Sequence, residues 1–201
     1  MKQKSIRLSG TGLMLLTWCL AATALADEPP QIVTEICGGC HGVDGNSIVP
    51  TFPSLAGQQT EYTVKQLKEF VSRKRLNVAM EPFLPQLKQA DLDEIATYFY
   101  AQKPAPREVG DAALAEAGRA IFERGKPDAG VPACGACHMP TGEGFTRFPR
   151  LAGQDQEYIK KQIADFRSGT RNNDRGRVMR AIAERMSDQD TEAVAGFISG
   201  L

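Results

Sequence analysis

The apolar residues of this chain recur with the period of an α-helix. In the segment after Asp91, four apolar residues fall at positions i, i+3, i+4 and i+7: Leu92, Ile95, Ala96 and Phe99. Asp91 and Glu94 form a capping box at the start of this predicted helix. No segment alternates apolar and polar residues as a half-buried β-strand does. The pattern therefore predicts an all-α fold.

Two further helices follow from the same pattern. One is expected to have Thr60 as its N-cap. Its apolar face consists of Val64, Leu67 and Val71. The other covers the segment from Asp111 to Arg124, which is rich in Ala, Leu and Glu, and Gly125 ends it.

The pattern also repeats along the chain. The block FPSLAGQQTEYTVKQLKEF (52–70) matches FPRLAGQDQEYIKKQIADF (148–166) at an offset of 96, and residues 80–99 match 179–198 at an offset of 99. Matching blocks in one order indicate a duplication. A segment with two prolines and a glycine, about 101–113, has no apolar period and is predicted to be a linker. The predicted domains are residues 27–104 and 105–201.

Residues 1–26 have a different character. Basic residues at the start precede an apolar run from Leu13 to Leu25, and Ala24-Leu25-Ala26 ends it. This order is typical of a secretory signal cleaved after Ala26. A membrane anchor, the alternative, needs about 20 apolar residues, and this run is shorter. We expect Cys19 to be removed with the signal, and the mature protein to be soluble in the periplasm.

Composition and charge exclude one class of partner. Lys plus Arg and Asp plus Glu both total 24, so the chain lacks the basic excess of a nucleic-acid-binding protein. The predicted cleavage removes three of the 24 basic residues and leaves 21 against 24 acidic ones. Each copy has about 80 to 90 residues, a size at which a hydrophobic core is marginal without a covalent or metal staple.

Each copy contains the motif Cys-x-x-Cys-His, in CGGCHGVDGNS (37–47) and CGACHMPTGEG (134–144). A thioredoxin-like redox pair would need a βαβ context that the pattern does not show. A four-thiolate zinc site built from both motifs would leave the following histidines without a role. In a c-type haem site, both cysteines form thioethers with the haem and the histidine is the proximal iron ligand. The motifs therefore predict two covalently bound haem c groups, held by Cys37, Cys40 and His41 and by Cys134, Cys137 and His138.

The sixth iron ligand must come from another residue type, because the chain has only two histidines. Methionine is the usual partner. The mature chain has four candidates: Met80, Met139, Met179 and Met186. Met139 directly follows His138 and cannot reach the opposite face of the haem, and Met186 aligns with Leu87 and is expected to pack in the core. Met80 and Met179 align with each other about forty residues after their histidines, and a buried apolar role is their alternative.

Taken together, the two Cys-x-x-Cys-His motifs, GVDGNS, the paired FPxLAGQ blocks and the closing MSDQDTEAVAGFISGL resemble the cytochrome c4 family of periplasmic dihaem cytochromes c. The resemblance covers essentially all of the mature chain. It implies two class I cytochrome c domains related by a pseudo-twofold axis, with the haems facing each other near the interface. It also implies that His41 pairs with Met80, and His138 with Met179, as iron ligands.

Other aligned residues receive expected roles around the haems. The carbonyls of Pro53 and Pro149 lie at the spacing at which cytochromes c often accept a hydrogen bond from the proximal histidine, and loop stiffening is the other interpretation. Two tyrosines and two arginines are candidates for bonding haem propionates, with a packed tyrosine and a solvated arginine as the alternative: Tyr62, Tyr158, Arg75 and Arg171.

Two six-coordinate irons leave no open site for a substrate, so one-electron exchange is the expected chemistry and no enzyme activity is expected. The family resemblance implies a membrane terminal oxidase as acceptor and a quinol-oxidising complex or periplasmic dehydrogenase as donor, with peripheral membrane association as a further expectation. A haem subunit of a flavocytochrome, such as a sulfide-oxidising one, is the first alternative. A dihaem peroxidase is less favoured, since such enzymes are larger and keep one iron accessible or histidine-ligated.

Overall fold

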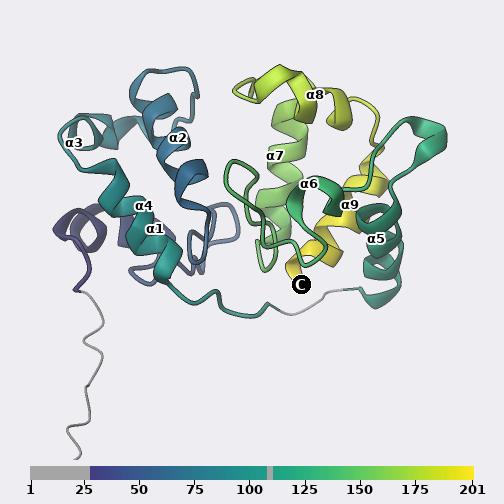
Figure 1. Cartoon of the computed structure of the whole chain (residues 1–201), viewed down its shortest axis with the longest axis horizontal. Helices are drawn as coiled ribbons and strands as arrows, with labels where there is room; N and C mark the ends of the chain where they lie inside the picture. Colours follow the sequence, from purple (N-terminus) through teal and green to yellow (C-terminus); the bar gives the residue numbers. More distant parts are fainter. Residues whose placement is uncertain (1–27, 108–110) are drawn as a thin grey trace, which may run out of the picture.

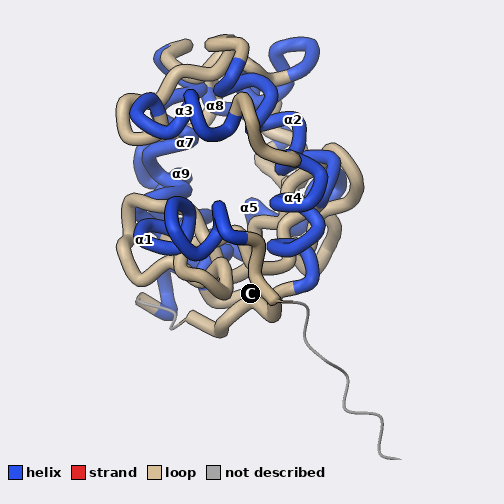
Figure 2. Tube along the Cα trace, turned by 90° about the vertical axis from the view of Figure 1, so that its left-hand side faces the viewer, coloured by secondary structure: helices blue, strands red, loops and turns tan. Residues whose placement is uncertain are grey.

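The computed structural model describes residues 28–107 and 111–201. The predicted signal, including Cys19, and residues 108–110 of the predicted linker lie outside this part of the chain. The described residues form helices and loops without a β-strand, which confirms the all-α class (Figure 2). Within these same residues, no helix is both long and apolar enough to cross a bilayer.

The helices form two groups that lie side by side, joined by the segment after α4 (Figure 1). The first group comprises η1 (Val33–Cys37), α1 (Gly38–His41), α2 (Thr60–Val71), η2 (Glu81–Phe83), α3 (Leu84–Leu87) and α4 (Leu92–Ala101). The second group comprises α5 (Ala112–Arg124), η3 (Pro127–Ala129), α6 (Gly135–His138), α7 (Gln156–Ser168), η4 (Arg175–Arg177), α8 (Val178–Ala183) and α9 (Asp188–Ser199). We refer to these groups as the first and second halves.

The helix ends match two of the three expected signals. The Asp91 side chain caps α4 by accepting hydrogen bonds from two backbone N–H groups of its first turn, but among the described residues Glu94 does not return a bond to the Asp91 N–H, so only the Asp91 side of the expected capping box forms. Gly125 ends α5 with a φ of 71°, and a Cβ there would lie 2.3 Å from the Val131 carbonyl oxygen. The expected cap at Thr60 is wrong. Gln59 is the N-cap residue of α2, its side chain makes no capping bond, and its Nε2 donates to the Glu143 carbonyl in the other half.

Each half has its own apolar core. In the first half the buried residues are Val33, Phe70, Leu84, Leu87, Ile95 and Phe99. The second core is larger because the long helix α5 packs along α9, at a point where Gly118 has no room for a Cβ beside the Ala193 carbonyl. Met186 is buried in this core, where it occupies the place that Leu87 has in the first half. The packing role expected for Met186 agrees with this position.

Candidate haem-binding site

A single cavity of about 1110 Å³ extends between the two halves. Its lining includes both cysteine motifs and the two aligned methionines: Cys37, Cys40, His41, Met80, Cys134, Cys137, His138 and Met179. A site for one small ligand has a volume of about 300–1,000 Å³. The cavity is larger than that range and is bordered twice by the same set of residues, as a site for two groups requires.

Short helices position the cysteines and histidines. Cys37 and Cys40 lie three residues apart in helical conformation, so their side chains share one face, and His41 ends α1 beside them. Gly42 then takes a φ of 77°, where a Cβ would lie 2.6 Å from the Asn46 carbonyl oxygen. Met139, which follows His138 in the same place, has a φ of 69°, an uncommon conformation for a residue with a side chain.

Each histidine is held through its Nδ1 atom. His41 Nδ1 lies 2.8 Å from the Pro53 carbonyl oxygen, and His138 Nδ1 lies 2.9 Å from that of Pro149. This contact fixes the ring and leaves Nε2 for a metal ion. Burial lowers the pKa of both imidazoles, and the bond to the carbonyl offsets only part of the shift. The rings are therefore neutral at pH 7, which is the form that binds iron.

The cysteines fit neither alternative to haem attachment. Burial raises the pKa of the Cys37 and Cys134 thiols to about 11, whereas redox-active Cys-x-x-Cys pairs have a lowered thiol pKa. Over residues 28–107 and 111–201, no three His, Cys, Asp or Glu side chains come together as a metal cluster would require. The two cysteine motifs therefore do not combine into a zinc site.

The two aligned methionines occupy different local structures. Met80 precedes η2 in a turn closed by its N–H on the Asn77 carbonyl at 3.0 Å, whereas Met179 lies in the first turn of α8. Both are partly buried against the core of their half and both border the cavity. Met186 also reaches the cavity but is buried in the core.

The candidate arginines are buried, so the alternative of a solvated arginine is wrong. Arg75 and Arg171 are each 9% exposed and cross between the halves. Arg171 donates to the Tyr62 hydroxyl at 2.8 Å, and Arg75 donates to that of Tyr158 at 3.4 Å. Each arginine also stacks on a phenylalanine ring of its own half and donates to the same glutamine pair, Gln66 and Gln162.

These two guanidinium groups give the centre of the molecule a strong positive charge. Within the described residues, neither Arg75 nor Arg171 forms an ion pair with a carboxylate. Burial alone would raise the pKa of Tyr62, but Arg171 and Arg75 outweigh it and hold that pKa below its usual value. Buried cations require an anionic partner. The propionates of a bound haem are carboxylates of the kind that would satisfy them, so this region fits the group that the cysteine motifs predict.

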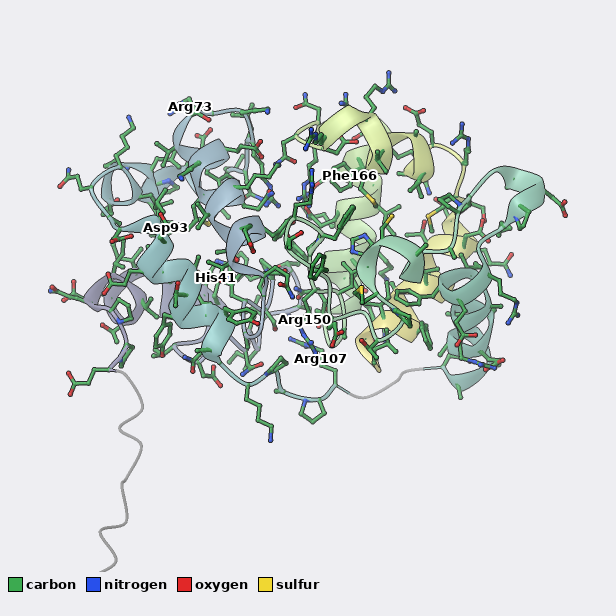
Figure 3. All side chains as sticks on the ribbon, viewed as in Figure 1. His41, Arg73, Asp93, Arg107, Arg150 and Phe166 are labelled. Atoms are coloured by element: carbon green, nitrogen blue, oxygen red, sulfur yellow. The ribbon has the colours of Figure 1, made fainter. Side chains whose placement is uncertain are left out.

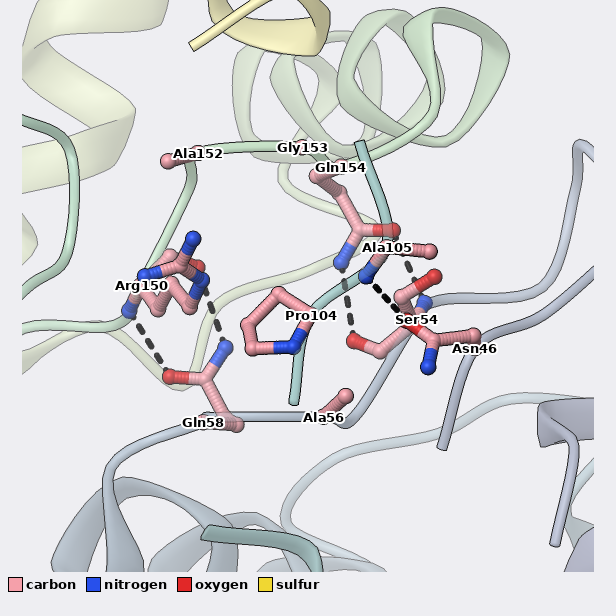
Figure 4. Close-up of a pocket in the computed structure, with 10 residues that line it drawn as sticks. All are labelled: Asn46, Ser54, Ala56, Gln58, Pro104, Ala105, Arg150, Ala152, Gly153 and Gln154. Atoms are coloured by element: carbon pink, nitrogen blue, oxygen red, sulfur yellow. Dashed lines mark hydrogen bonds between the residues drawn. The ribbon is translucent and has the colours of Figure 1, made fainter. Parts of the chain in front are cut away.

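Two kinds of residue at the contact between the halves were not predicted. Gln58 and Gln154, the last residues of the FPxLAGQ blocks, are buried and bond the backbone of the opposite half (Figure 4). Their signal was a polar residue repeated at the offset of 96. Arg107, which lies near Arg150 where the halves meet (Figure 3), donates to the carbonyls of Ser47 and Gly153 at 2.7 and 2.8 Å. Arg107 has no counterpart in the repeat that could have identified it.

Comparison with known proteins places both halves in haem-protein families. Residues 115–201 match the family described as Cytochrome c, and residues 24–99 match the family described as Cytochrome C oxidase, cbb3-type, subunit III.

Individual proteins match over most of their length. The chain is 44% identical to cytochrome c4 of Stutzerimonas stutzeri over 190 residues, covering 87% of this chain and 88% of that one. The crystal structure of reduced recombinant cytochrome c4 from Pseudomonas stutzeri matches with a TM-score of 0.79 at 42% identity, covering 84% of this chain and 94% of that one. A thiosulfate dehydrogenase electron acceptor of Stutzerimonas stutzeri (strain A1501) is 38% identical, covering 82% of this chain and 78% of that protein.

Proposed function

We infer, because the chain belongs to the cytochrome c4 family, that it works as an electron carrier with two haem groups between partners outside the cytoplasm. The chain is a cytochrome c electron-transfer protein with two covalently bound haem c groups. When bound, haem supplies reversible one-electron exchange through its iron.

In the proposed assignment, Cys37, Cys40, Cys134 and Cys137 attach the two haems, with His41 and Met80 as iron ligands in the first half and His138 and Met179 in the second. One observation carries this assignment. A single cavity is bordered by both motifs and both methionines, with each histidine tied to a proline carbonyl through Nδ1. The residues hold the rings in one orientation, keep the imidazoles neutral and exclude water from the apolar part of the cavity.

The same assignment would make the protein a carrier rather than an enzyme, because one histidine and one methionine would hold each iron and leave no open place for a substrate. We propose the periplasm as its location, a quinol-oxidising complex or a periplasmic dehydrogenase as its donor, and a membrane terminal oxidase as its acceptor. The predicted domains of residues 27–104 and 105–201 each carry one haem in this proposal.

The mass of the intact mature protein tests the proposal directly. We expect the mass of the chain from Asp27 plus two haems, and a haem-stained band on a denaturing gel. Replacing both cysteines of one motif, Cys134→Ala with Cys137→Ala, is expected to remove one haem and leave the other. A wild-type mass with one haem or none would contradict the proposal.

A second candidate concerns the donor. A relative named as a thiosulfate dehydrogenase electron acceptor is 38% identical to this chain, which favours a dehydrogenase of inorganic sulfur compounds over the flavocytochrome partner considered from the sequence. Reduction of the purified ferric protein by a thiosulfate dehydrogenase, compared with reduction by a quinol-oxidising complex, distinguishes the two donors. Copurification of a flavin-containing chain would instead support the flavocytochrome.

A further inference from the structure

The glutamine that ends each FPxLAGQ block binds one residue of the opposite half through both the oxygen and the nitrogen of its side-chain amide (Figure 4). Gln154 accepts a hydrogen bond from the Ser54 N–H at 2.9 Å and donates one to the Ser54 carbonyl at 3.1 Å. Gln58 accepts from the Arg150 N–H at 2.8 Å and donates to the Arg150 carbonyl at 3.0 Å. Both glutamines are buried, so water does not compete for these bonds.

The residue that each glutamine binds, Ser54 or Arg150, directly follows the proline whose carbonyl oxygen contacts the proximal histidine. The Pro53 carbonyl and the Ser54 N–H belong to one peptide group, and that carbonyl oxygen lies 2.8 Å from His41 Nδ1. In the second half, Gln58 likewise accepts from the N–H of the Pro149–Arg150 peptide, and the carbonyl oxygen of that peptide lies 2.9 Å from His138 Nδ1. Each histidine is therefore joined, through one peptide and two hydrogen bonds, to a glutamine of the other half.

Hydrogen bonds in such a chain strengthen one another. An acceptor on a peptide N–H increases the negative charge on the carbonyl oxygen of the same peptide, and the hydrogen bond that this oxygen accepts is strengthened by about 10–30%. A stronger acceptor draws the Nδ1 proton away from the imidazole and makes Nε2 a better electron donor to a metal. Greater electron donation from an axial ligand favours ferric over ferrous iron.

We propose that Gln154 lowers the reduction potential of the haem in the first half, acting through His41, and that Gln58 does the same for the second half through His138. This inference rests on the proposed function, in which these histidines bind iron. Each half thus adjusts the iron of the other. Contact between the halves becomes part of the redox site rather than only a means of holding two domains together.

The test is a pair of near-isosteric variants, Gln154→Leu and Gln58→Leu, in the intact two-haem protein. Gln154→Leu is expected to shift the equilibrium of the first haem toward the ferrous form by about two- to threefold, and to leave the second haem in place. At 59 mV per tenfold change for one electron, this is a rise of roughly 20–30 mV. Gln58→Leu is expected to give the same rise at the second haem only. A redox titration followed by NMR signals assigned to each haem measures both potentials.

Gln59→Leu is the matched control. The Gln59 amide also crosses between the halves, donating to the Glu143 carbonyl at 3.0 Å and to the Gly144 carbonyl at 3.4 Å, but it makes no hydrogen bond to the Pro149–Arg150 peptide that holds His138. The substitution removes only these side-chain bonds, and the Gln59 backbone N–H that donates to Gln58 Oε1 at 3.0 Å is unchanged. Both potentials are therefore expected to match those of the wild-type protein. Gln154→Asn, which shortens the side chain by one methylene, supplies a polar variant that draws the amide away from Ser54 should the leucine variant fail to fold.

The pattern of shifts decides the inference. A rise at the haem opposite the substituted glutamine supports it. Equal shifts at both haems, a shift in the same half as the substitution, or an equal shift in Gln59→Leu would overturn it and leave the glutamines a purely structural role. Failure of the proposed function is separate, because it shows as a wild-type protein without two haems or without two reducible irons.

Discussion

In the first half, the cysteine motif begins at the last residue of the five-residue helix η1, whereas in the second half residues 125–133, which include η3, separate the motif from the 13-residue helix α5. The segments that carry the candidate methionines differ as well. Met80 lies in a turn before a segment with two prolines, and Met179 lies in a helix. The contact of each histidine with its proline carbonyl is nevertheless the same to within 0.1 Å, at 2.8 and 2.9 Å.

This difference shows which part of the duplicated unit tolerates change. Elements on the outside of each half differ in length and conformation, while a set of polar residues between the halves has the same identity and position in both copies. Tyr62, Gln66 and Arg75 make the same kinds of contact as their counterparts 96 residues later. A site used from both sides constrains both copies together.

Charge is the second difference between the halves. Residues 27–104 contain seven basic and ten acidic side chains, a net charge of −3, and residues 105–201 contain fourteen of each. Three arginines of the second half lie within four residues of Met179 in the sequence, at positions 175, 177 and 180, and the last two form ion pairs with Glu184 and Asp174. The electrostatic surroundings of the two irons therefore differ between the halves.

The largest effect is expected from removing one of the two methionines proposed as iron ligands. Met80→Ala and Met179→Ala should each abolish about half of the weak absorption band that sulfur ligation gives ferric low-spin haem, and each should open one ferrous iron to carbon monoxide. Absorption spectra with and without carbon monoxide measure both changes. Met186→Ala is the control and should leave both ligand signals intact. A lost ligand signal in that variant would reverse the choice between Met179 and Met186.

Removing an equivalent buried side chain from either core should lower the free energy of unfolding of the two halves by about the same amount. Met186→Ala and Leu87→Ala each empty a buried position of the core, so we expect a loss of about 2–5 kcal/mol in the free energy of unfolding of the affected half. The swaps Met186→Leu and Leu87→Met keep the volume and should cost less than about 1.5 kcal/mol. Chemical denaturation of all four variants tests this equivalence. A mild effect of Leu87→Ala alone would show that the first core, with its shorter helices, collapses around the gap.

The smallest of these three expected effects is the difference between the reduction potentials of the two haems. One unit charge at ~10 Å with an effective dielectric of ~20 contributes about 1.7 kcal/mol, and salt reduces this by a factor of about three at one Debye length. At ~59 mV per tenfold change, three charges separate the haems by tens of millivolts up to roughly 100 mV. The haem at Cys37 and Cys40 should have the lower potential, because negative charge favours ferric iron. A titration followed by NMR would contradict this if the first haem is reduced first.

The sequence predicted most of what lies within one half. The periodicity of α4 and α5, the cap at Asp91 and the stop at Gly125 are local signals, and the structure confirms each of them. The expected cap at Thr60 failed because Thr60 is already the first residue of α2, and Gln59, the N-cap residue before it, bonds the other half. Local patterns carry no information about such a contact.

The contacts between the two halves could not be predicted from the sequence for the same reason. Nothing in the spacing of Arg75 or Arg171 indicates that both are buried and donate to tyrosines 83 and 109 residues away. The sequence shows the glutamines at 58 and 154 only as a repeated residue type. Their partners are backbone atoms, which every residue has, so the sequence cannot identify them. The assignment of the iron ligands and the domain boundaries stay predictions for the experiments above.

The reciprocal contacts between the halves have a further consequence for how the molecule arose. Gln58 donates to the carbonyl of residue 150, and Gln154 donates to that of residue 54. In the same way, Arg75 donates to Tyr158, and Arg171 donates to Tyr62. Such an exchange of equivalent contacts is the rule of an isologous interface in a symmetric homodimer. The chain is therefore organised as a homodimer joined into one polypeptide, in which the linker holds two self-complementary surfaces at a high effective concentration. Once joined, each copy was free to acquire its own charge while the shared surface kept the symmetry of the pair.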